Sequence, residues 1–396
     1  MSDSRAVLKS ALIWLAGPSF LLAGPYDPPT NYYAAAEGLS GVDLEDALHN
    51  IIDNHTVVPY SWPPFQAVDQ SPTNSNEVEL IYSSGTRAKN DNGGSAGDWN
   101  REHLWPRSYG IFNDGGADNS DIFNLRPCDV QVNAERGSLF FDNTGQAIPL
   151  QFSAPGCSKD NNSWEPRDDE KGDIARACFY MHVRYDGSDS ETNDLTLSDS
   201  PDRGASRFGT LETLLEWHRL DPVNERNRRR NQEVYENWQG NRNPFIDHPK
   251  FAEQLFLAQY PSRDSDSDGL PDFWEWAALS SDQFDARSDP DGDEFNMLLE
   301  YAFGGNPTVA DSSAPYLTSI GGLPRFVYYR TIDPQGISYT IETTVDLENG
   351  PWLPVPVLNS LSQNAGPKRT RVFAQIPVTS DNQRFYRMKV TAADSQ

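Results

Sequence analysis

Hydrophobic positions in the first part of the chain recur with the spacing of helices. Between residues 39 and 52 the apolar side chains stand three or four positions apart, at Leu44, Ala47, Leu48, Ile51 and Ile52. That spacing places them on one face of a helix. The same kind of pattern predicts helices over residues 171–185 and 211–217, whereas residues 78–82 (VELIY) have the composition of a strand.

From residue 315 onward the pattern changes to the two-residue alternation of strands. Five segments show it, separated by turn residues: RFVYYRTI, SYTIETTV, WLPVPVL, RTRVFAQIPV and QRFYRMKVTA. Short strands of this kind are typical of a β-sandwich. We therefore expect an α+β chain with a mixed domain over residues 30–261, a short acidic segment over residues 262–308, and an all-β sandwich over residues 313–394.

Charge is unevenly distributed along a strongly acidic chain. The formal net charge is -26 for 396 residues. Residues 261–310 carry 12 acids and 2 bases, whereas residues 311–396 carry 7 acids and 8 bases. An acidic surface repels nucleic acid at long range, so any basic track for nucleic acid must be local. We interpret the acidity itself as a solubilising surface.

One basic cluster stands out in the helical stretch after residue 222. It contains four arginines: Arg226, Arg228, Arg229 and Arg230. Guanidinium groups contact phosphate oxygens without reading sequence, so the cluster can bind nucleic acid. Pairing with the many carboxylates of the chain explains the cluster equally well, and the sequence leaves both interpretations open.

The N-terminus has the features of a secretory signal peptide. Arg5 and Lys9 precede the apolar run ALIWLAGPSFLLAG, which ends in small residues. We expect residues 1–23 to be removed on export and the protein to be secreted or periplasmic.

Three cysteines occur along the chain: Cys128, Cys157 and Cys178. An odd number cannot pair completely within one chain. A bridge between Cys157 and either of the other two remains open, and Cys178 is expected to be a buried free thiol because it lies in the apolar run IARACFYM.

Candidate chemistry concentrates between residues 98 and 142. Glu102 and His103 are adjacent there, and Asn133 and Arg136 follow in a segment with a helical pattern. An imidazole titrates near neutral pH, so it can take a proton from water. Carboxylate and amide oxygens are ligands that Mg²⁺ prefers. The combination indicates metal-assisted hydrolysis of a phosphodiester.

Four ordered motifs between residues 32 and 260 carry a family resemblance. They read REHLWPRS, SDIFNLRPCDVQVNAERG, WEPRDDEKGDIARACFYMHVRYDG and QGNRNPFIDHP. Together they resemble the bacterial endonuclease I family of secreted nucleases, which belongs to the His-Me finger, or ββα-metal, nucleases. The resemblance implies a β-hairpin with a packed helix, His103 as general base, and Glu102 and Asn133 as Mg²⁺ ligands. It also implies cleavage of DNA, with RNA as a further substrate, to leave 5′-phosphates.

Arg126 and Arg136 lie within the second of these motifs. The fork of donors on a guanidinium fits phosphate oxygens, which makes both residues candidates for contact with the substrate. A structural salt bridge is the alternative for each of them.

Two acidic loops follow the nuclease-like segment. DSDSDGLPDFWE matches the D-x-D-x-D-G-x₅-E spacing of an EF-hand-type calcium loop. DPDGDEFNMLLE repeats the ligand spacing but has Glu294 where glycine is expected, so its turn should be strained. The pair resembles the calcium repeats of dockerin and thrombospondin type 3 modules; an acidic linker without bound ion is the alternative. The expected structural Ca²⁺ ligands are Asp264, Asp266, Asp268, Asp272, Glu275, Asp289, Asp291, Asp293 and Glu300.

The sequence therefore favours a secreted, Mg²⁺-dependent, non-specific endonuclease, expected to be a monomer. Two alternatives from other classes stay open. One is a phosphodiesterase acting on small substrates, and the other is a calcium-dependent cell-surface binding protein on an inactive nuclease scaffold. The C-terminal sandwich carries no catalytic residues in the sequence, so surface attachment, carbohydrate contact and simple spacing are all compatible with it.

Overall fold

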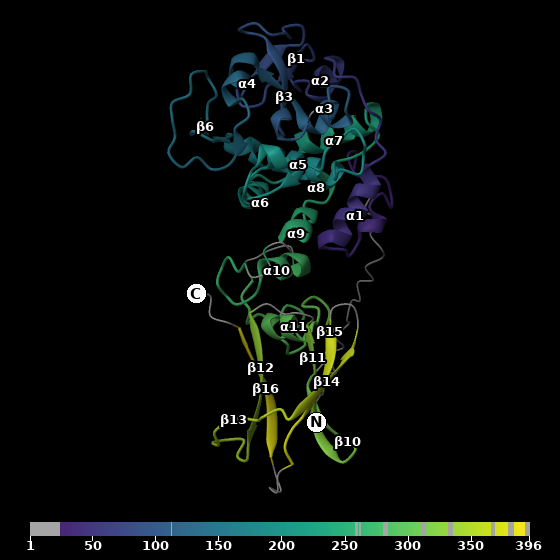
Figure 1. Ribbon diagram of the computed structural model, residues 1–396, viewed down its shortest axis with the longest axis vertical. Coiled ribbons are helices and arrows are strands. Elements are labelled where there is room, and N and C mark those ends of the chain that lie inside the picture. The colour runs from purple at the N-terminus through teal and green to yellow at the C-terminus, as the bar shows by residue number, and fades with distance from the viewer. Residues whose placement is uncertain are drawn as a thin grey trace, which may run out of the picture.

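The computed structural model is elongated, with a mixed α/β region at one end, two helices in the middle and a β region at the other end (Figure 1). The structure describes residues 24–111, 113–257, 260, 263–279, 284–310, 314–331, 336–365, 369–378 and 384–392. The expected signal peptide over residues 1–23 lies outside the described residues. Among those residues, no helix is long and apolar enough to cross a membrane.

A β-hairpin followed by a helix forms the part of the first region that carries the candidate chemistry. β3 (Trp99–His103) pairs antiparallel with β4 (Leu125–Asp129), and α4 (Val130–Arg136) begins directly after β4. The Asp129 carboxylate caps this helix by accepting the backbone N–H groups of Gln131 and Val132 at 2.9 and 3.3 Å. The expected β-hairpin with a packed helix is confirmed, and His103 is the last residue of β3.

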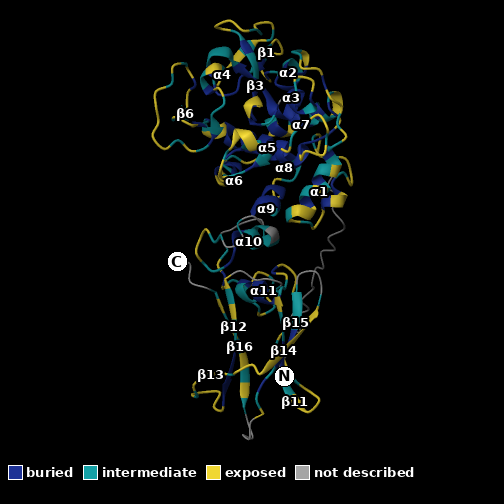
Figure 2. Ribbon diagram, in the orientation of Figure 1, coloured by how far each residue is buried: buried dark blue, intermediate teal, exposed yellow. Residues whose placement is uncertain are grey.

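The helix α5 (Asp168–Arg184) runs through the middle of the same region. The sequence predicts one apolar face, but α5 is buried on nearly all sides, charged residues included. It packs against α1 (Gly41–Ile52), α6 (Leu211–Leu220) and α8 (Pro244–Asp247). Figure 2 shows the buried residues gathered around α5 and β3. The predicted helix over residues 171–185 is confirmed, and its burial extends beyond one face because neighbouring helices cover the others.

Shorter elements complete the first region. The expected strand over residues 78–82 is reduced to β1 (Glu77–Glu79), which pairs with β2 (Thr86–Ala88). The other helices are α2 (Pro63–Val68), α3 (Ala117–Ser120), α7 (Glu225–Asn237) and α9 (Phe251–Phe256). The remaining strands are β5 (Phe140–Phe141), β6 (Ser158–Lys159), β7 (Ser163–Glu165), β8 (Thr196–Leu197) and β9 (Arg207–Phe208).

The three cysteines are free thiols. Cys128 and Cys178 are buried, and the Cys157 thiol contacts the carbonyl oxygen of Tyr82 at 3.6 Å. Burial raises the pKa of Cys178 to about 12, so this thiol stays protonated. The expected buried free Cys178 is confirmed, and neither bridge is formed.

Two helices join the first region to the β region. α10 (Asp272–Leu279) turns Phe273 and Trp276 toward the core of the first region. α11 (Met297–Phe303) packs against β11 (Leu323–Thr331) and β16 (Phe385–Ala392). The rings of Trp274 and Tyr301 meet with centroids 5.3 Å apart, which links the two helices.

The β region consists of two antiparallel sheets. One has the order β10-β11-β15-β14 and the other β13-β12-β16. Their bounds are β10 (Tyr316–Ile320), β12 (Ile337–Thr344), β13 (Leu353–Pro354), β14 (Asn359–Asn364) and β15 (Arg369–Gln375). A small shared core contains Phe326 and Ala374 from the first sheet and Ile341 from the second. The sequence missed β10 and β14, which lie at the two edges of the four-stranded sheet.

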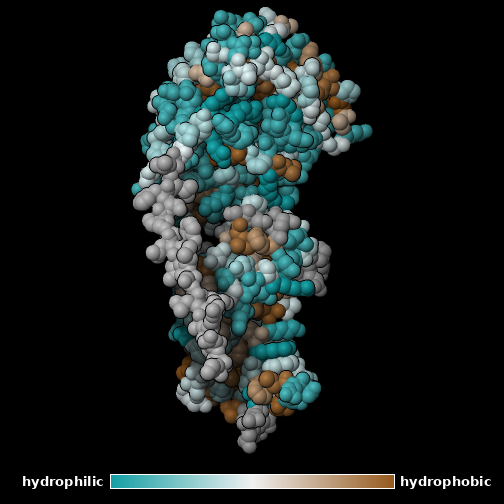
Figure 3. Space-filling view, turned by 180° about the vertical axis from the view of Figure 1, so that it is seen from behind, coloured by the Kyte–Doolittle hydropathy of each residue, from teal (hydrophilic) through white to brown (hydrophobic). Residues whose placement is uncertain are grey.

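The two ends of the molecule also differ in surface character. Seen from behind, the surface of the first region is largely hydrophilic, and hydrophobic residues show at the level of the β region (Figure 3). The mixed first region and the antiparallel β region together confirm the expected α+β class.

Candidate active site

His103 is held at the end of β3 by contacts on both sides of its ring. Its Nε2 lies 3.0 Å from the carbonyl oxygen of Asn119, so Nε2–H donates to that oxygen and Nδ1 is left as the basic nitrogen. The Tyr60 ring lies 5.6 Å from the imidazole. Burial lowers the pKa of His103 to about 4, so the ring is neutral at neutral pH. It is therefore a proton acceptor of fixed orientation.

Glu102 points to the opposite side of β3, because consecutive strand residues face opposite ways. Its Oε1 accepts the Tyr82 hydroxyl at 3.1 Å and lies 3.2 Å from the Arg136 guanidinium. The residue is 2% exposed, and burial raises the pKa of the carboxyl to about 7 although Arg136 and Tyr82 act to lower it. A cation at this carboxylate would offset the burial of its charge.

Asn133 reaches the same side of the hairpin as Glu102. Its Nδ2 donates to Oδ1 of Asn100 at 2.7 Å, and Asn100 lies two residues before Glu102 on β3. The amide oxygen of Asn133 is thus turned away from this hydrogen bond and can act as a ligand. A carboxylate and an amide oxygen on one face fit a hard divalent ion such as Mg²⁺.

Arg136 holds the strand end that carries His103. Its guanidinium donates to the backbone oxygens of His103 and Leu104 at 3.1 and 2.8 Å, besides pairing with Glu102. Only 1% of the residue is exposed. These are the contacts of a positioning residue; contact with substrate phosphate stays a prediction.

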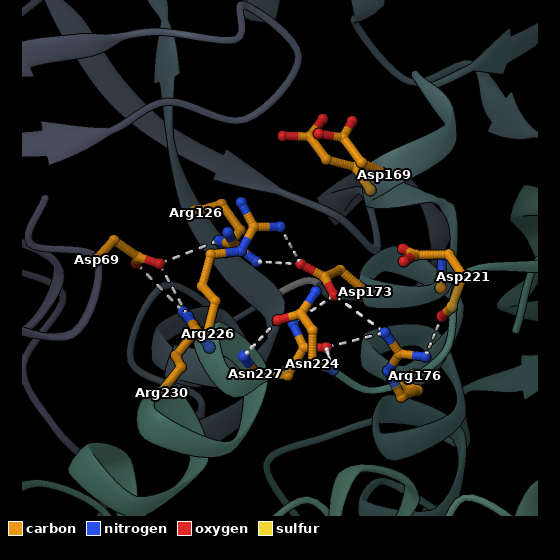
Figure 4. Close-up of polar contacts among 12 residues, drawn as sticks. Asp69, Arg126, Asp169, Asp173, Arg176, Asp221, Asn224, Arg226, Asn227 and Arg230 are labelled. Carbon is orange, nitrogen blue, oxygen red and sulfur yellow. Dashed lines mark hydrogen bonds and ion pairs between the residues drawn. The ribbon is translucent and has the colours of Figure 1, made fainter. Parts of the chain in front are cut away.

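Arg126 lies in a buried ion network with two aspartates (Figure 4). Its Nε is 3.1 Å from Asp69 and its Nη1 is 3.7 Å from Asp173. Asp173 also pairs with Arg176 at 3.0 Å. These arginines keep the pKa of Asp173 at about 2 although burial opposes it. The network joins β4 to α5, and a phosphate contact for Arg126 stays a prediction.

The four arginines of α7 have different surroundings. Arg226 pairs with Asp173 at 2.6 Å, and Arg230 pairs with Asp69 at 2.9 Å and donates to two backbone oxygens. Arg229 donates to the carbonyl oxygen of Gln70 at 3.5 Å, and Arg228 is exposed. Intramolecular pairing therefore accounts for two of the four, and nucleic-acid binding by the cluster stays a prediction.

The structure brings two further arginines to the His103 side of the hairpin. Arg101 lies two positions before His103, and its guanidinium stacks 3.7 Å from the Tyr60 ring and 4.0 Å from the Trp62 ring. Arg107 also lies close enough to help lower the pKa of His103. The sequence analysis missed both, although the two-residue period of β3 would have placed Arg101 beside His103.

A cavity of about 240 Å³ opens beside Tyr60 on this side. It is lined by Val57, Val58, Pro59, Tyr60, Asp114, Gly115 and Ser120. Ser120 follows Asn119, the residue that fixes the His103 ring. The cavity therefore lies near His103, although His103 itself is not among the lining residues.

The acidic loops form two separate carboxylate clusters. Ligand atoms of Asp264, Asp266 and Asp268 lie within 4.8 Å of one another, as do those of Asp289, Asp291 and Asp293. Gly269 and Glu294 both have positive φ, 96° and 75°, so the strained turn expected at Glu294 is confirmed.

Glu275 closes the first acidic loop from α10. It is fully buried and neither carboxylate oxygen has a hydrogen-bond partner among the described residues. Burial, with Asp268 and Asp266 nearby, raises the pKa of Glu275 to about 9, against a small lowering by the Phe284 backbone. Asp272, by contrast, pairs with Arg263 at 3.0 Å and accepts the Ser265 amide, so its oxygens fix the loop. Its role as a ligand stays a prediction.

A buried neutral imidazole at the end of a strand, followed by a second strand and a helix, is the arrangement that the motifs predict. The family model for Endonuclease I matches residues 40–250. The chain therefore belongs to the endonuclease I family, and it is a nuclease, as the motifs predict.

Two curated relatives agree with this assignment. An extracellular ribonuclease of Bacillus subtilis (strain 168) is 47% identical over 249 residues, which cover 62% of this chain and 84% of the relative. An extracellular ribonuclease of Bacillus amyloliquefaciens is 49% identical over 228 residues, which cover 57% of this chain and 78% of the relative. Both are extracellular proteins, which confirms the expected location outside the cytoplasm.

Proposed function

We propose that this protein is a metal-dependent endonuclease that cleaves RNA and DNA outside the cell. The observation that carries the proposal is the fixed neutral ring of His103, whose Nε2–H is held by the Asn119 carbonyl. The two ribonuclease relatives make RNA the first substrate to test. DNA cleavage, expected from the family resemblance, is the second.

In this mechanism Nδ1 of His103 takes a proton from a water molecule, which attacks phosphorus as the bond to the 3′ oxygen breaks. Arg136 keeps the strand end in place by holding the backbone oxygen of His103. Glu102 and Asn133 would hold Mg²⁺, which when bound stabilises the charge on the phosphate and the leaving oxygen. The products are a 5′-phosphate and a 3′-hydroxyl.

The test is cleavage of a long single-stranded RNA and of plasmid DNA by the purified chain with Mg²⁺, beside an His103→Ala variant. Cleavage by the wild type with 5′-phosphate ends, lost in the variant, is expected. His248→Ala is the matched control, because His248 lies near the end of α8 rather than in the hairpin. Cleavage that persists in His103→Ala would exclude His103 as the base.

The same assay separates the alternatives. A phosphodiesterase for small substrates would hydrolyse bis(p-nitrophenyl) phosphate without competition by RNA. A binding protein on an inactive scaffold would cleave neither polymer with any divalent ion. Both outcomes would contradict the proposed function.

We also propose that the acidic loops bind structural Ca²⁺ and that the chain has three domains, over residues 30–261, 262–308 and 313–394. Support comes from the buried carboxylate of Glu275, which needs a positive partner. Asp264, Asp266 and Asp268 would supply the other oxygens of the first loop, and Asp289, Asp291, Asp293 and Glu300 those of the second. Calorimetric titration with Ca²⁺ should show two sites, of which Glu275→Gln removes the first; an unchanged titration would contradict the assignment.

A further inference from the structure

The four-stranded sheet of the β region differs in charge from the rest of the chain. Strands β10, β11, β15 and β14 contain no Asp or Glu but carry the arginines Arg325, Arg330, Arg369 and Arg371. The chain as a whole has a net charge of -26. A sheet whose charged residues are all basic is therefore a local exception on an acidic molecule.

The strand register sorts these residues onto two faces. Phe326 and its partner Ala374 face the core shared with the other sheet. Because side chains alternate, the neighbouring pairs face outward: Val327 with Phe373, and Tyr329 with Arg371. The outer face also includes Tyr316, Arg325, Arg369 and Leu361.

On this outer face guanidinium groups lie against aromatic rings. The Arg371 guanidinium is 5.6 Å from the Tyr316 ring, 5.9 Å from Tyr329 and 5.1 Å from Phe373. It also donates to the Tyr316 hydroxyl. The Arg369 guanidinium lies 4.8 Å from the Tyr329 ring. Three rings and three arginines thus form one surface, which we call the aromatic–arginine face.

Two of the three arginines on this face, Arg325 and Arg371, form no ion pair within the part of the chain that the structure describes. Arg325 is only 8% exposed, and its Nε and Nη1 have no hydrogen-bond partner there. The other sheet provides a comparison, since its Arg387 pairs with Glu342 at 2.7 Å. Two edge residues of the face stay open to solvent, Tyr316 at 40% and Leu361 at 57% exposure.

We propose that the aromatic–arginine face binds single-stranded nucleic acid. Unstacked bases can lie on Tyr316, Tyr329 and Phe373, while Arg369 and Arg371 contact the phosphates between them. Arg325 is buried beneath this surface and adds to its positive charge. A duplex hides the faces of its bases, so it can use the arginines but not the rings. A neutral carbohydrate can use the rings but leaves the arginines without anionic partners.

The role of this face in cleavage rests on the proposed function, whereas the binding of nucleic acid to it does not. The first region is acidic and holds at least two of its four clustered arginines in internal pairs, so it attracts a polyanion poorly at long range. A separate binding face on the same chain would keep a long single strand near the nuclease. It should therefore matter for long substrates and not for short ones.

The test measures the binding of a fluorescein-labelled 12-nucleotide oligouridylate to the full-length His103→Ala protein. Binding is read from fluorescence anisotropy in a buffer that contains Ca²⁺ but no Mg²⁺. Binding should weaken roughly 5- to 100-fold in Tyr329→Ala or Phe373→Ala, because each loses one stacking surface. Arg371→Ala should lower the slope of log K against log salt by about 0.7. Tyr329→Phe keeps the ring and should bind as the parent does.

Arg330→Ala is the matched control, since Arg330 lies on the same strand but alternates to the opposite face. Its binding should equal that of the parent. Equal weakening by Arg330→Ala and Arg371→Ala would overturn the proposal, as would unchanged binding in Tyr329→Ala. Displacement by a neutral oligosaccharide, or equal affinity for duplex and single strand, would also overturn it by assigning the face to another ligand.

Failure of this proposal and failure of the proposed nuclease are distinguishable. Binding is measured in a variant without the general base, so it does not depend on catalysis. With His103 restored, Tyr329→Ala should raise KM for long RNA and leave the cleavage of a dinucleotide unchanged. If the wild-type protein did not cleave a dinucleotide, the proposed active site would be contradicted, and the proposed binding face would not.

Discussion

The nuclease region and the β region use arginine in opposite ways. In the first, Arg126, Arg136 and Arg230 are buried and paired with Glu102 or aspartates. In the second, Arg369 and Arg371 lie across aromatic rings on the outside of a sheet. Buried and paired charges fix the position of other groups, whereas Arg371, which forms no ion pair among the described residues, remains able to bind a ligand.

The physical reason is the cost of burial. A charge taken out of water must be compensated by a partner and by further hydrogen bonds. Arg136 has both, since it pairs with one carboxylate and donates to two backbone oxygens. A surface arginine keeps most of its hydration and needs no partner. Replacing an arginine is therefore expected to lower stability in the first region and to weaken ligand binding in the β region.

The largest expected effect is on catalysis in the first region. His103→Ala should lower the rate of RNA cleavage by about 10²–10⁴-fold, because the proton acceptor is removed. Oligonucleotide binding by the β region should persist. The measurement is initial rate beside anisotropy, with thermal melting to show that the variant folds. Loss of binding together with activity would show that the two regions do not act separately.

The next effect compares the two kinds of arginine directly. Arg136→Met should cost about 3–5 kcal/mol of unfolding free energy, because the Glu102 carboxylate loses its buried partner. The matched change Arg371→Met should cost less, about 0–1 kcal/mol, because the half-buried Arg371 forms no ion pair among the described residues. Urea unfolding of both variants measures the difference. Equal costs would contradict the division into positioning and ligand-binding arginines.

A smaller effect concerns the segment between the two regions. Removing Ca²⁺ with a chelator should lower the stability of the acidic loops by about 2.7 kcal/mol when the ion was present at 100 times its Kd. Calorimetry should show a shift in the unfolding of the C-terminal part, which Glu275→Gln reduces. RNA cleavage with added Mg²⁺ should survive, since the loops lie outside the active site. If only the unfolding transition of the nuclease region shifted, the ion would be bound there and not in the acidic loops.

The last effect concerns the pH dependence of stability in the first region. Burial lowers the pKa of His218 to about 3 from its usual 6.5, and among the described residues its Nδ1 has no hydrogen-bond partner that would accept a second proton. Between these values the unfolded state binds more protons, so the stability that His218 contributes is complete above pH 6.5 and is lost as the pH falls toward 3.

His218→Gln should therefore flatten the acid side of the stability profile by up to about 1.4 kcal/mol per pH unit. His49→Gln is the control, since its ring has Asp53 and Asp186 within 3.9 Å. Denaturant unfolding at several pH values measures the slopes. Parallel profiles for wild type and His218→Gln would show that His218 is not the group that titrates.

Local signals explain why the hairpin and its helix were predictable. The β3 strand ends at His103, and α4 begins after Asp129, whose side chain caps it. Both features depend on residues close together in the sequence. The turn strain at Glu294 was predictable for the same reason, because a single position in the loop requires a positive φ.

Edge strands and buried charges were not predictable in this way. β14 (NSLSQN) is exposed along its whole length, so it lacks the alternation by which strands are found. Arg230 meets Asp69, which lies 161 residues earlier. Whether such an arginine binds phosphate or an internal carboxylate depends on which distant chain segments fold next to it.

The sequence by itself determined the family, the position of the candidate histidine, the two acidic loops and the change from helices to strands, since each depends on neighbouring residues. Only the tertiary structure decided which arginines form buried ion pairs. It also decided that Tyr316, Tyr329, Phe373 and Arg371, from three different strands, share one face. The reason is that burial and charge pairing depend on contacts between distant segments, which helix packing and strand register bring together.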